Sequence, residues 1–121
     1  MSFKVLAIDD SRTIRSLMMA TLKNAGLEAC LAEDGVDGLA KMEEFDPDVI
    51  VTDLNMPNLD GFGVIEGVRA HPDHKTKPVL VLTTESAPAL KARARDAGAT
   101  GWIVKPFDGE RLVSALRRVA G

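Results

Sequence analysis

Five polar side chains come directly after four short, largely apolar runs of the chain. The side chains are Asp9, Asp10, Asp53, Thr83 and Lys105, and the runs are 4–8, 49–52, 79–82 and 102–104. If the runs are parallel strands of one sheet, their carboxyl ends meet at a single edge, which brings these groups together. Three carboxylates there can hold a divalent cation. One of them can then attack a phosphoryl group whose charge the cation, the hydroxyl and the ammonium stabilise.

The three carboxylates also indicate which cation is needed. A carboxylate that attacks an anionic phosphoryl group beside two other carboxylates meets strong repulsion unless a cation is present. A site of hard oxygen ligands suits Mg²⁺, which keeps several waters and coordinates phosphate oxygens. Asp53 is the predicted nucleophile because it lies between the acid pair and the lysine in the expected sheet.

The elements that would position these residues alternate regularly along the chain. Strand-like runs at 4–8, 27–31, 49–52, 79–82 and 102–104 are separated by amphipathic helical stretches. This alternation predicts an α/β fold, in which helices cover both faces of a doubly wound, five-stranded parallel sheet. Helix starts are expected at Ser11, Asp34, Asp60, Ser86 or Pro88, and Asp108. A strand order of 2-1-3-4-5 would put the two aspartate-bearing strands side by side.

Length and composition narrow the function classes. The 121 residues predict one domain, and 45% apolar with 27% charged residues is typical of a soluble globular protein. No apolar run approaches the roughly 20 residues that span a bilayer, and no signal-peptide pattern is present, so membrane insertion is not expected. The lone Cys30 favours a reducing cytoplasm. His71 and His74 fall in a polar connection, 71–77, away from the predicted site, and are assigned no role.

The net charge of −3 hides an asymmetry between the two parts of the chain. Residues 1–90 contain 15 acidic and 8 basic side chains, whereas residues 91–121 contain 3 acidic and 7 basic ones. An acidic chain is a poor candidate for nonspecific nucleic-acid binding. The basic part is either a solvated helix surface or a surface that attracts acidic partner peptides.

Four stretches carry a resemblance to a known family. They are Ile8–Arg12, Asp53–Gly61, Leu82–Glu85 and Gly98–Phe107. In their order and spacing, the chain resembles the receiver domain of two-component response regulators, and most closely the stand-alone CheY-like chemotaxis regulators. The resemblance covers essentially the whole chain. It implies the flavodoxin-like strand order 2-1-3-4-5, for which CheY is a standard example, and a single receiver domain over residues 1–121 without an output domain.

The resemblance implies how phosphorylation and metal binding are divided among the acidic residues. Asp53 would accept the phosphoryl group from the phosphohistidine of a sensor kinase. Asp10, Asp53 and the backbone carbonyl of Asn55 would bind Mg²⁺ directly, and Asp9 would act through water. The protein would be a phosphoaccepting signalling switch, not an enzyme, that catalyses the phosphoryl transfer to itself and its own dephosphorylation.

The resemblance also implies a switch that answers phosphorylation. Thr83 and Lys105 would each contact a phosphoryl oxygen, and the Lys105–Pro106 bond would be cis. Thr83 would then move toward the phosphoryl group, and the aromatic residue of the fifth strand would turn inward. That residue is Trp102, where similar proteins more often carry tyrosine or phenylalanine.

The remaining roles concern signal lifetime and partners. Asn55 and Glu85, two residues after Asp53 and Thr83, would tune the lifetime of the acyl phosphate. A face on the fourth helix, fifth strand and fifth helix would bind the target; its residues include Lys91, Arg95, Trp102 and Arg111. The implied partners are a chemotaxis sensor kinase, a flagellar motor switch protein or another acidic peptide, and a phosphatase. The protein is expected to be a cytoplasmic monomer.

Three other functions are alternatives to this one. A phosphorelay intermediate, which passes its phosphoryl group to a histidine phosphotransfer protein, is barely distinguishable at the sequence level. An aspartyl-phosphate hydrolase is disfavoured because Asn55 puts an amide where such enzymes carry a second carboxylate. A flavin-binding protein is disfavoured because its first loop should offer neutral donors to phosphate, and this loop presents Asp9 and Asp10.

Overall fold

The computed structural model describes residues 3–120 as alternating strands and helices. The strands are β1 (Lys4–Ile8), β2 (Glu28–Ala32), β3 (Val49–Thr52), β4 (Val79–Thr83) and β5 (Gly101–Val104). The helices are α1 (Arg12–Asn24), α2 (Gly35–Phe45), α3 (Gly61–Ala70), α4 (Pro88–Ala97) and α5 (Gly109–Ala120). Residues 1, 2 and 121, the outer limits of the expected domain, lie outside the described residues.

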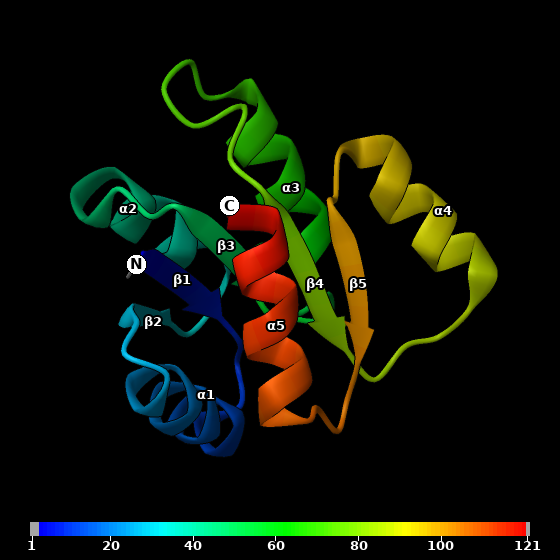
Figure 1. Ribbon diagram of the computed structural model, residues 1–121. Helices are drawn as coiled ribbons and strands as arrows, with labels where there is room; N and C mark the ends of the chain where they lie inside the picture. The colour runs from blue at the N-terminus through cyan, green and yellow to red at the C-terminus, as the bar shows by residue number, and fades with distance from the viewer. Residues whose placement is uncertain (1–2, 121) are drawn as a thin grey trace.

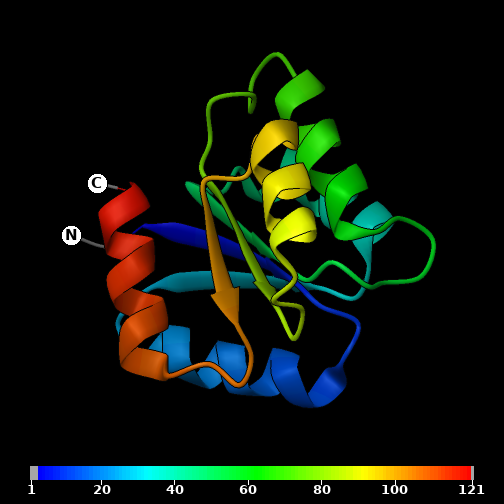
Figure 2. The same cartoon turned by 90° about the vertical axis from the view of Figure 1, so that its right-hand side faces the viewer.

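The five strands form one parallel sheet in the order β2-β1-β3-β4-β5, which confirms the predicted fold class (Figure 1). Helices α1 and α5 cover one face, and α2, α3 and α4 cover the other (Figure 2). Strands β1 and β3 are neighbours, as the order requires. The edge strand β2 exposes Glu28, in agreement with the edge position expected for it.

Each face of the sheet carries its own apolar core. Leu6 and Ile8 of β1 point into the core under α2, α3 and α4, while Val5 and Ala7 point into the core under α1 and α5. This division explains why the central strands read as continuous apolar runs, since both of their faces are covered. The central strands are therefore rigid supports for the residues that follow their carboxyl ends.

Side-chain caps start most of the helices where the sequence predicts them. Ser11, Asp34 and Asp60 accept backbone N–H groups at the starts of α1, α2 and α3, and Asp108 does so before α5. Helix α4 differs, because it begins at Pro88 after Ala87 and has no side-chain cap. No helix within residues 3–120 combines the length and apolar character needed to cross a membrane.

Candidate functional site

Three carboxylates meet at the carboxyl edge of β1 and β3. The register pairs Ile8 with Thr52, so the residues that follow, Asp9 and Asp53, leave the sheet side by side. The backbone N–H of Asp53 donates to the carbonyl of Ile8 at 3.0 Å, which fixes the two chain segments together. Asp10 completes the cluster: one oxygen from each of the three carboxylates lies within 4.8 Å of the others.

Lys105 reaches this cluster from the end of β5. Its backbone N–H donates to the carbonyl of Thr83 at 2.7 Å, and the peptide bond to Pro106 is cis. The ammonium lies 2.6 Å from Asp9 Oδ2 and 3.2 Å from Asp53 Oδ2, and its side chain is only 9% exposed. The structure thus brings together all the acidic and basic groups predicted for the site.

Burial and charge act in opposite directions on this ion pair. Burial lowers the pKa of Lys105, but the hydrogen bond to Asp9 and the charges of Asp53 and Asp9 outweigh it, so the net pKa is raised. Burial raises the pKa of Asp9 by more than the Lys105 hydrogen bond lowers it. Lys105 therefore stays charged at neutral pH and stabilises the Asp9 carboxylate, which burial would otherwise favour as a neutral acid.

The carboxylate oxygens of the cluster fit Mg²⁺. Three carboxylates and one ammonium leave a formal charge of −2, which a divalent cation balances. Both oxygens of Asp9 already accept hydrogen bonds, Oδ1 from the Ser11 N–H at 2.8 Å and Oδ2 from Lys105. Asp10 is exposed, whereas Asp53 accepts the Leu54 N–H at Oδ1 (2.7 Å) and the Lys105 ammonium at Oδ2 (3.2 Å). Asp10 is therefore the most accessible of the three carboxylates for a metal ion, and hydrogen bonds hold the Asp9 and Asp53 carboxylates in place beside it.

Thr83 and Trp102, the two predicted switch residues, are joined through the backbone of Glu85. Thr83 is fully buried, and its Oγ1 accepts the Glu85 N–H at 3.3 Å. Trp102 is half-buried, and its indole Nε1–H donates to the Glu85 carbonyl at 3.1 Å. The sequence contains no local signal for this connection, because it depends on how the segment after β4 folds against β5.

The two residues predicted to tune lifetime lie on facing loops. Asn55 is exposed and Glu85 is half-buried, and the Asn55 amide donates to Glu85 Oε1 at 3.4 Å. Asn55 comes two residues after Asp53, so this pair stands beside the nucleophile. Its position allows it to influence how water approaches Asp53.

The residues of the predicted partner face line two hollows that share Trp102. A hollow of about 260 Å³ between α4 and β5 is lined by Lys91, Arg95 and Trp102, among others. Lys91 and Arg95 are exposed, as is Arg111 on α5. The segments that carry these residues meet at Trp102, which links the surface to Glu85 and Thr83.

The loop after Asp53 is held by residues that the sequence did not single out as part of the site. Asn58 adopts a left-handed conformation, with φ of 70°, and its Nδ2 donates to Asp34 Oδ2 at 2.7 Å. The hydrogen bonds from the Asp37 N–H and from Asn58 lower the pKa of Asp34. Asp34 therefore caps α2 and anchors the nucleophile loop at the same time.

At Gly61, the start of α3 packs closely against the backbone of Asp53 and Leu54. A Cβ atom at Gly61 would lie 2.2 Å from the carbonyl oxygen of Asp53 and 2.8 Å from Leu54 Cα. We expect Gly61→Ala to lower the free energy of unfolding by about 1–3 kcal/mol, because backbone rather than a movable side chain must shift. Urea denaturation measures this loss.

Gly67→Ala is the matched control for this prediction. A Cβ atom at Gly67 would meet only the end of the Leu39 side chain, at 2.7 Å, which can rotate away. The gain in helix propensity, about 1 kcal/mol, offsets part of that cost. Equal losses for the two variants would contradict the role assigned to Gly61.

Comparisons with known proteins agree with this geometry. The family model described as the response regulator receiver domain matches residues 5–117. Chemotaxis protein CheY1 of Helicobacter pylori is 38% identical over 120 residues, covering 98% of this chain and 97% of that protein. The structure of chemotaxis protein CheY4 of Vibrio cholerae superimposes with a TM-score of 0.93 at 45% identity, covering 98% of this chain and 99% of that chain.

A third relative carries the metal in its structure. The receiver domain of sensor histidine kinase PA1611 from Pseudomonas aeruginosa has a magnesium ion coordinated in the active site cleft. It superimposes with a TM-score of 0.91 at 25% identity and covers 100% of this chain and 99% of that chain. With the family model spanning most of the sequence and both chemotaxis relatives aligned over nearly their full length, the chain belongs to the response regulator receiver domain family.

Proposed function

We propose that the protein is a phosphorylation-controlled switch in which Asp53 accepts a phosphoryl group from the phosphohistidine of a sensor kinase. The observation that carries this proposal is the buried Lys105 ammonium between Asp9 and Asp53, with Asp10 beside them. A carboxylate that lies next to a fixed ammonium and two further carboxylates is suited to attack an anionic group. An isolated surface aspartate has neither feature.

In the proposed transfer, a carboxylate oxygen of Asp53 attacks phosphorus. A new P–O bond forms while the P–N bond of the phosphohistidine breaks, and its electron pair returns to the imidazole. The Leu54 N–H holds Oδ1 of Asp53 and so orients the carboxylate. The Lys105 ammonium and the Thr83 hydroxyl stabilise charge on the transferring group. Asp10, Asp53 and the Asn55 carbonyl would hold Mg²⁺, with Asp9 acting through water, and the ion would supply further charge neutralisation.

The connection through Glu85 supports a route from phosphorylation to the partner face. A phosphoryl group at Asp53 offers new acceptor oxygens to the Thr83 hydroxyl. If Thr83 turns toward it, the hydrogen bond from the Glu85 N–H to Oγ1 is lost. The Glu85 backbone then shifts, and the bond from Trp102 Nε1 to its carbonyl changes with it.

The fluorescence of Trp102 should therefore report activation. The chain contains one tryptophan, so its emission is unambiguous. We expect beryllofluoride with Mg²⁺, a stable mimic of the phosphoryl group, to change the emission intensity or maximum of the wild-type protein. Thr83→Val keeps the shape of the side chain but removes the hydroxyl, and should reduce that change. An unaltered wild-type spectrum when beryllofluoride is bound would contradict the proposed coupling.

The relatives named as chemotaxis proteins support a role in bacterial chemotaxis. We propose a cytoplasmic monomer that receives its phosphoryl group from a chemotaxis kinase and binds an acidic target such as a flagellar motor switch protein. A phosphatase is a further proposed partner. The exposed Lys91, Arg95 and Arg111 around Trp102 support an acidic target.

Salt should slow the association with such a target. Exposed charges separated by more than about 8 Å are largely screened at physiological ionic strength. The contribution of electrostatic attraction to the association rate therefore falls further as the salt concentration rises. We expect the association rate of the beryllofluoride-bound protein with an acidic peptide to fall as NaCl increases in stopped-flow measurements. Lys91→Gln should make that dependence shallower. A rate independent of salt would argue against electrostatic recognition.

Incubation with a small phosphodonor tests the proposed function directly. With acetyl phosphate and Mg²⁺, the intact mass should rise by one phosphoryl group, and the added mass should disappear after the donor is removed. With excess EDTA the increase should be absent. Equal incorporation with and without the metal would overturn the proposal.

A further inference from the structure

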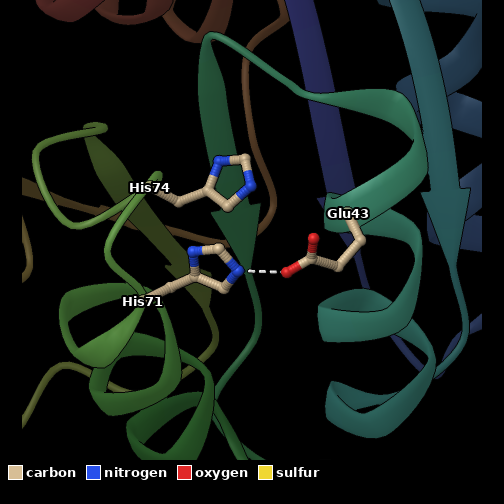
Figure 3. Close-up of side chains that lie close together, drawn as sticks. All are labelled: Glu43, His71 and His74. Carbon is tan, nitrogen blue, oxygen red and sulfur yellow. Dashed lines mark hydrogen bonds and ion pairs between the residues drawn. The ribbon is translucent and has the colours of Figure 1, made fainter.

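A second cluster of polar side chains lies at the opposite edge of the sheet from Asp53. Glu43 lies near the end of α2, His71 caps the end of α3, and His74 follows in the next turn. The two imidazoles and the carboxylate face one another across the space between α2 and the end of α3 (Figure 3). One ligand atom from each of the three residues lies within 4.8 Å of the others. These are the only two histidines in the sequence.

His74 is buried without a hydrogen bond that would account for its burial. The residue is 4% exposed, and within residues 3–120 no partner for its Nδ1 is found. Asp46 Oδ1 is 3.7 Å from this nitrogen, which is beyond hydrogen-bonding distance. The other ring nitrogen, Nε2, faces Glu43 (Figure 3). Because a buried polar atom without a partner is costly, this imidazole requires an explanation.

His71 already has partners at both nitrogens. Its Nδ1 accepts the Asp73 N–H at 3.0 Å, so the ring proton is assigned to Nε2, which is hydrogen-bonded to Glu43 Oε1. The hydrogen bond between His71 and Glu43 links α2 to the end of α3, which explains why these two residues lie together. It leaves the burial of His74 unexplained.

We propose that Glu43, His71 and His74 form a binding site for a divalent transition-metal ion such as Zn²⁺. Two imidazole nitrogens and one carboxylate are a ligand set that Zn²⁺ accepts, and they leave a fourth position for water. Mg²⁺ prefers oxygen ligands, so the two ends of the molecule would select different ions. Asp46 would accept the Nδ1–H of His74 as the outer partner that metal-bound imidazoles usually have.

Metal binding requires two small rearrangements. Ligand atoms on a tetrahedral ion at about 2.0–2.1 Å lie roughly 3.3 Å apart, so the hydrogen-bonded His71–Glu43 pair must separate to admit the ion, and any pair near the present limit of 4.8 Å must move closer. The Glu43 side chain, 55% exposed, is free to rotate for this. The proton of His71 must also move from Nε2 to Nδ1, which releases the Asp73 N–H. Asp73 is exposed, so water can accept that N–H.

Calorimetric titration with ZnCl₂ tests the proposal, using the full chain in excess MgCl₂ so that the aspartate cluster is occupied. We expect one Zn²⁺ per chain. Glu43→Gln and His74→Gln should each weaken binding at least 10-fold, and Asp46→Asn about 10-fold, since loss of an outer partner typically costs 10–100-fold. Asparagine tolerates the left-handed backbone of Asp46, φ 51°, so this variant should fold. Asp53→Asn is the matched control and should leave Zn²⁺ binding unchanged.

Magnetic resonance of the two histidine rings gives a second readout that does not depend on any variant folding. Zn²⁺ should shift the ring nitrogen signals of both His71 and His74 and the backbone amide of Asp73. Zn²⁺ binding of equal affinity in Glu43→Gln and wild type would overturn the proposal. So would unmoved ring signals at saturating Zn²⁺. Neither result would bear on phosphorylation at Asp53, which lies at the other edge of the sheet.

Discussion

Replacing Asp53 with asparagine is expected to lower phosphoryl incorporation from acetyl phosphate by at least about a thousandfold, the scale of losing a nucleophile. The amide has almost the same shape as the carboxylate and can still accept the Leu54 N–H through its oxygen. It lacks the charge and the reactive electron pairs that attack phosphorus. Intact-mass analysis with Mg²⁺ present measures the loss.

Asp73→Asn makes the matched control for this substitution. Asp73 is an exposed aspartate away from the cluster, so its replacement should leave incorporation at the wild-type level. Because Asp53→Asn keeps the size of the side chain, the variant should fold, and its unfolding in urea should show this by a midpoint comparable to that of the wild type. Undiminished, stable labelling of Asp53→Asn would refute the assignment of the nucleophile.

Lys105→Met is expected to have the next largest effect, with opposite signs on catalysis and on metal binding. Without the ammonium, the phosphorylation rate should fall by about 10²–10³-fold, the usual cost of one preorganised charge-stabilising group. Affinity for Mg²⁺ should rise, because the ammonium that lies 2.6 Å from Asp9 and 3.2 Å from Asp53 no longer competes for them. Lys91→Met, an exposed substitution on α4, should change neither quantity.

The same substitution should destabilise the metal-free protein. Removing one partner of a buried ion pair leaves the other charge uncompensated, which costs about 3 kcal/mol. In EDTA, the free energy of unfolding of Lys105→Met should be lower than that of the wild type by about this amount. Adding Mg²⁺ should raise the free energy of unfolding of the variant by more than it raises that of the wild type. A variant as stable as wild type in EDTA would contradict the assigned role of the pair.

The pH dependence of stability tests whether the charged form of Lys105 stabilises the folded protein. The folded-state pKa of Lys105 is raised above its usual value of 10.5, so its contribution is complete below that pH. The contribution is lost as pH rises through the folded-state pKa. The wild-type protein should therefore lose this part of its stability only in strongly alkaline solution, whereas Lys105→Met should not show that loss.

The features that sequence reasoning predicted are those that follow from the parallel sheet. The alternation of strands and helices places Asp9 and Asp53 at one edge, and the register of β1 with β3 then makes them neighbours. Side-chain caps at Ser11 and Asp34 are local signals, and the structure contains both. The predicted strand bounds differ from the observed ones by at most one residue, as in β2, which begins at Glu28 rather than at Leu27.

The features that sequence reasoning missed depend on contacts between distant segments. The backbone of Glu85 joins Thr83 to Trp102 only because the segment after β4 folds back against β5. Asn58 anchors the nucleophile loop on Asp34, 24 residues earlier in the chain, which no local pattern indicates. The two histidines have a spacing that suits one helical turn, but Glu43 joins them from another helix.

Chemical trapping identifies the phosphorylated residue, on which the proposed function depends. Protein phosphorylated by acetyl phosphate in Mg²⁺ is reduced with borohydride, which attacks an acyl phosphate, and the altered residue is located by peptide sequencing. The expected result is one reduced side chain, at Asp53, that is absent when EDTA replaces Mg²⁺. Modification at Asp9 or Asp10 instead, or phosphate on a histidine, would contradict the assignment of Asp53 as the phosphorylated residue.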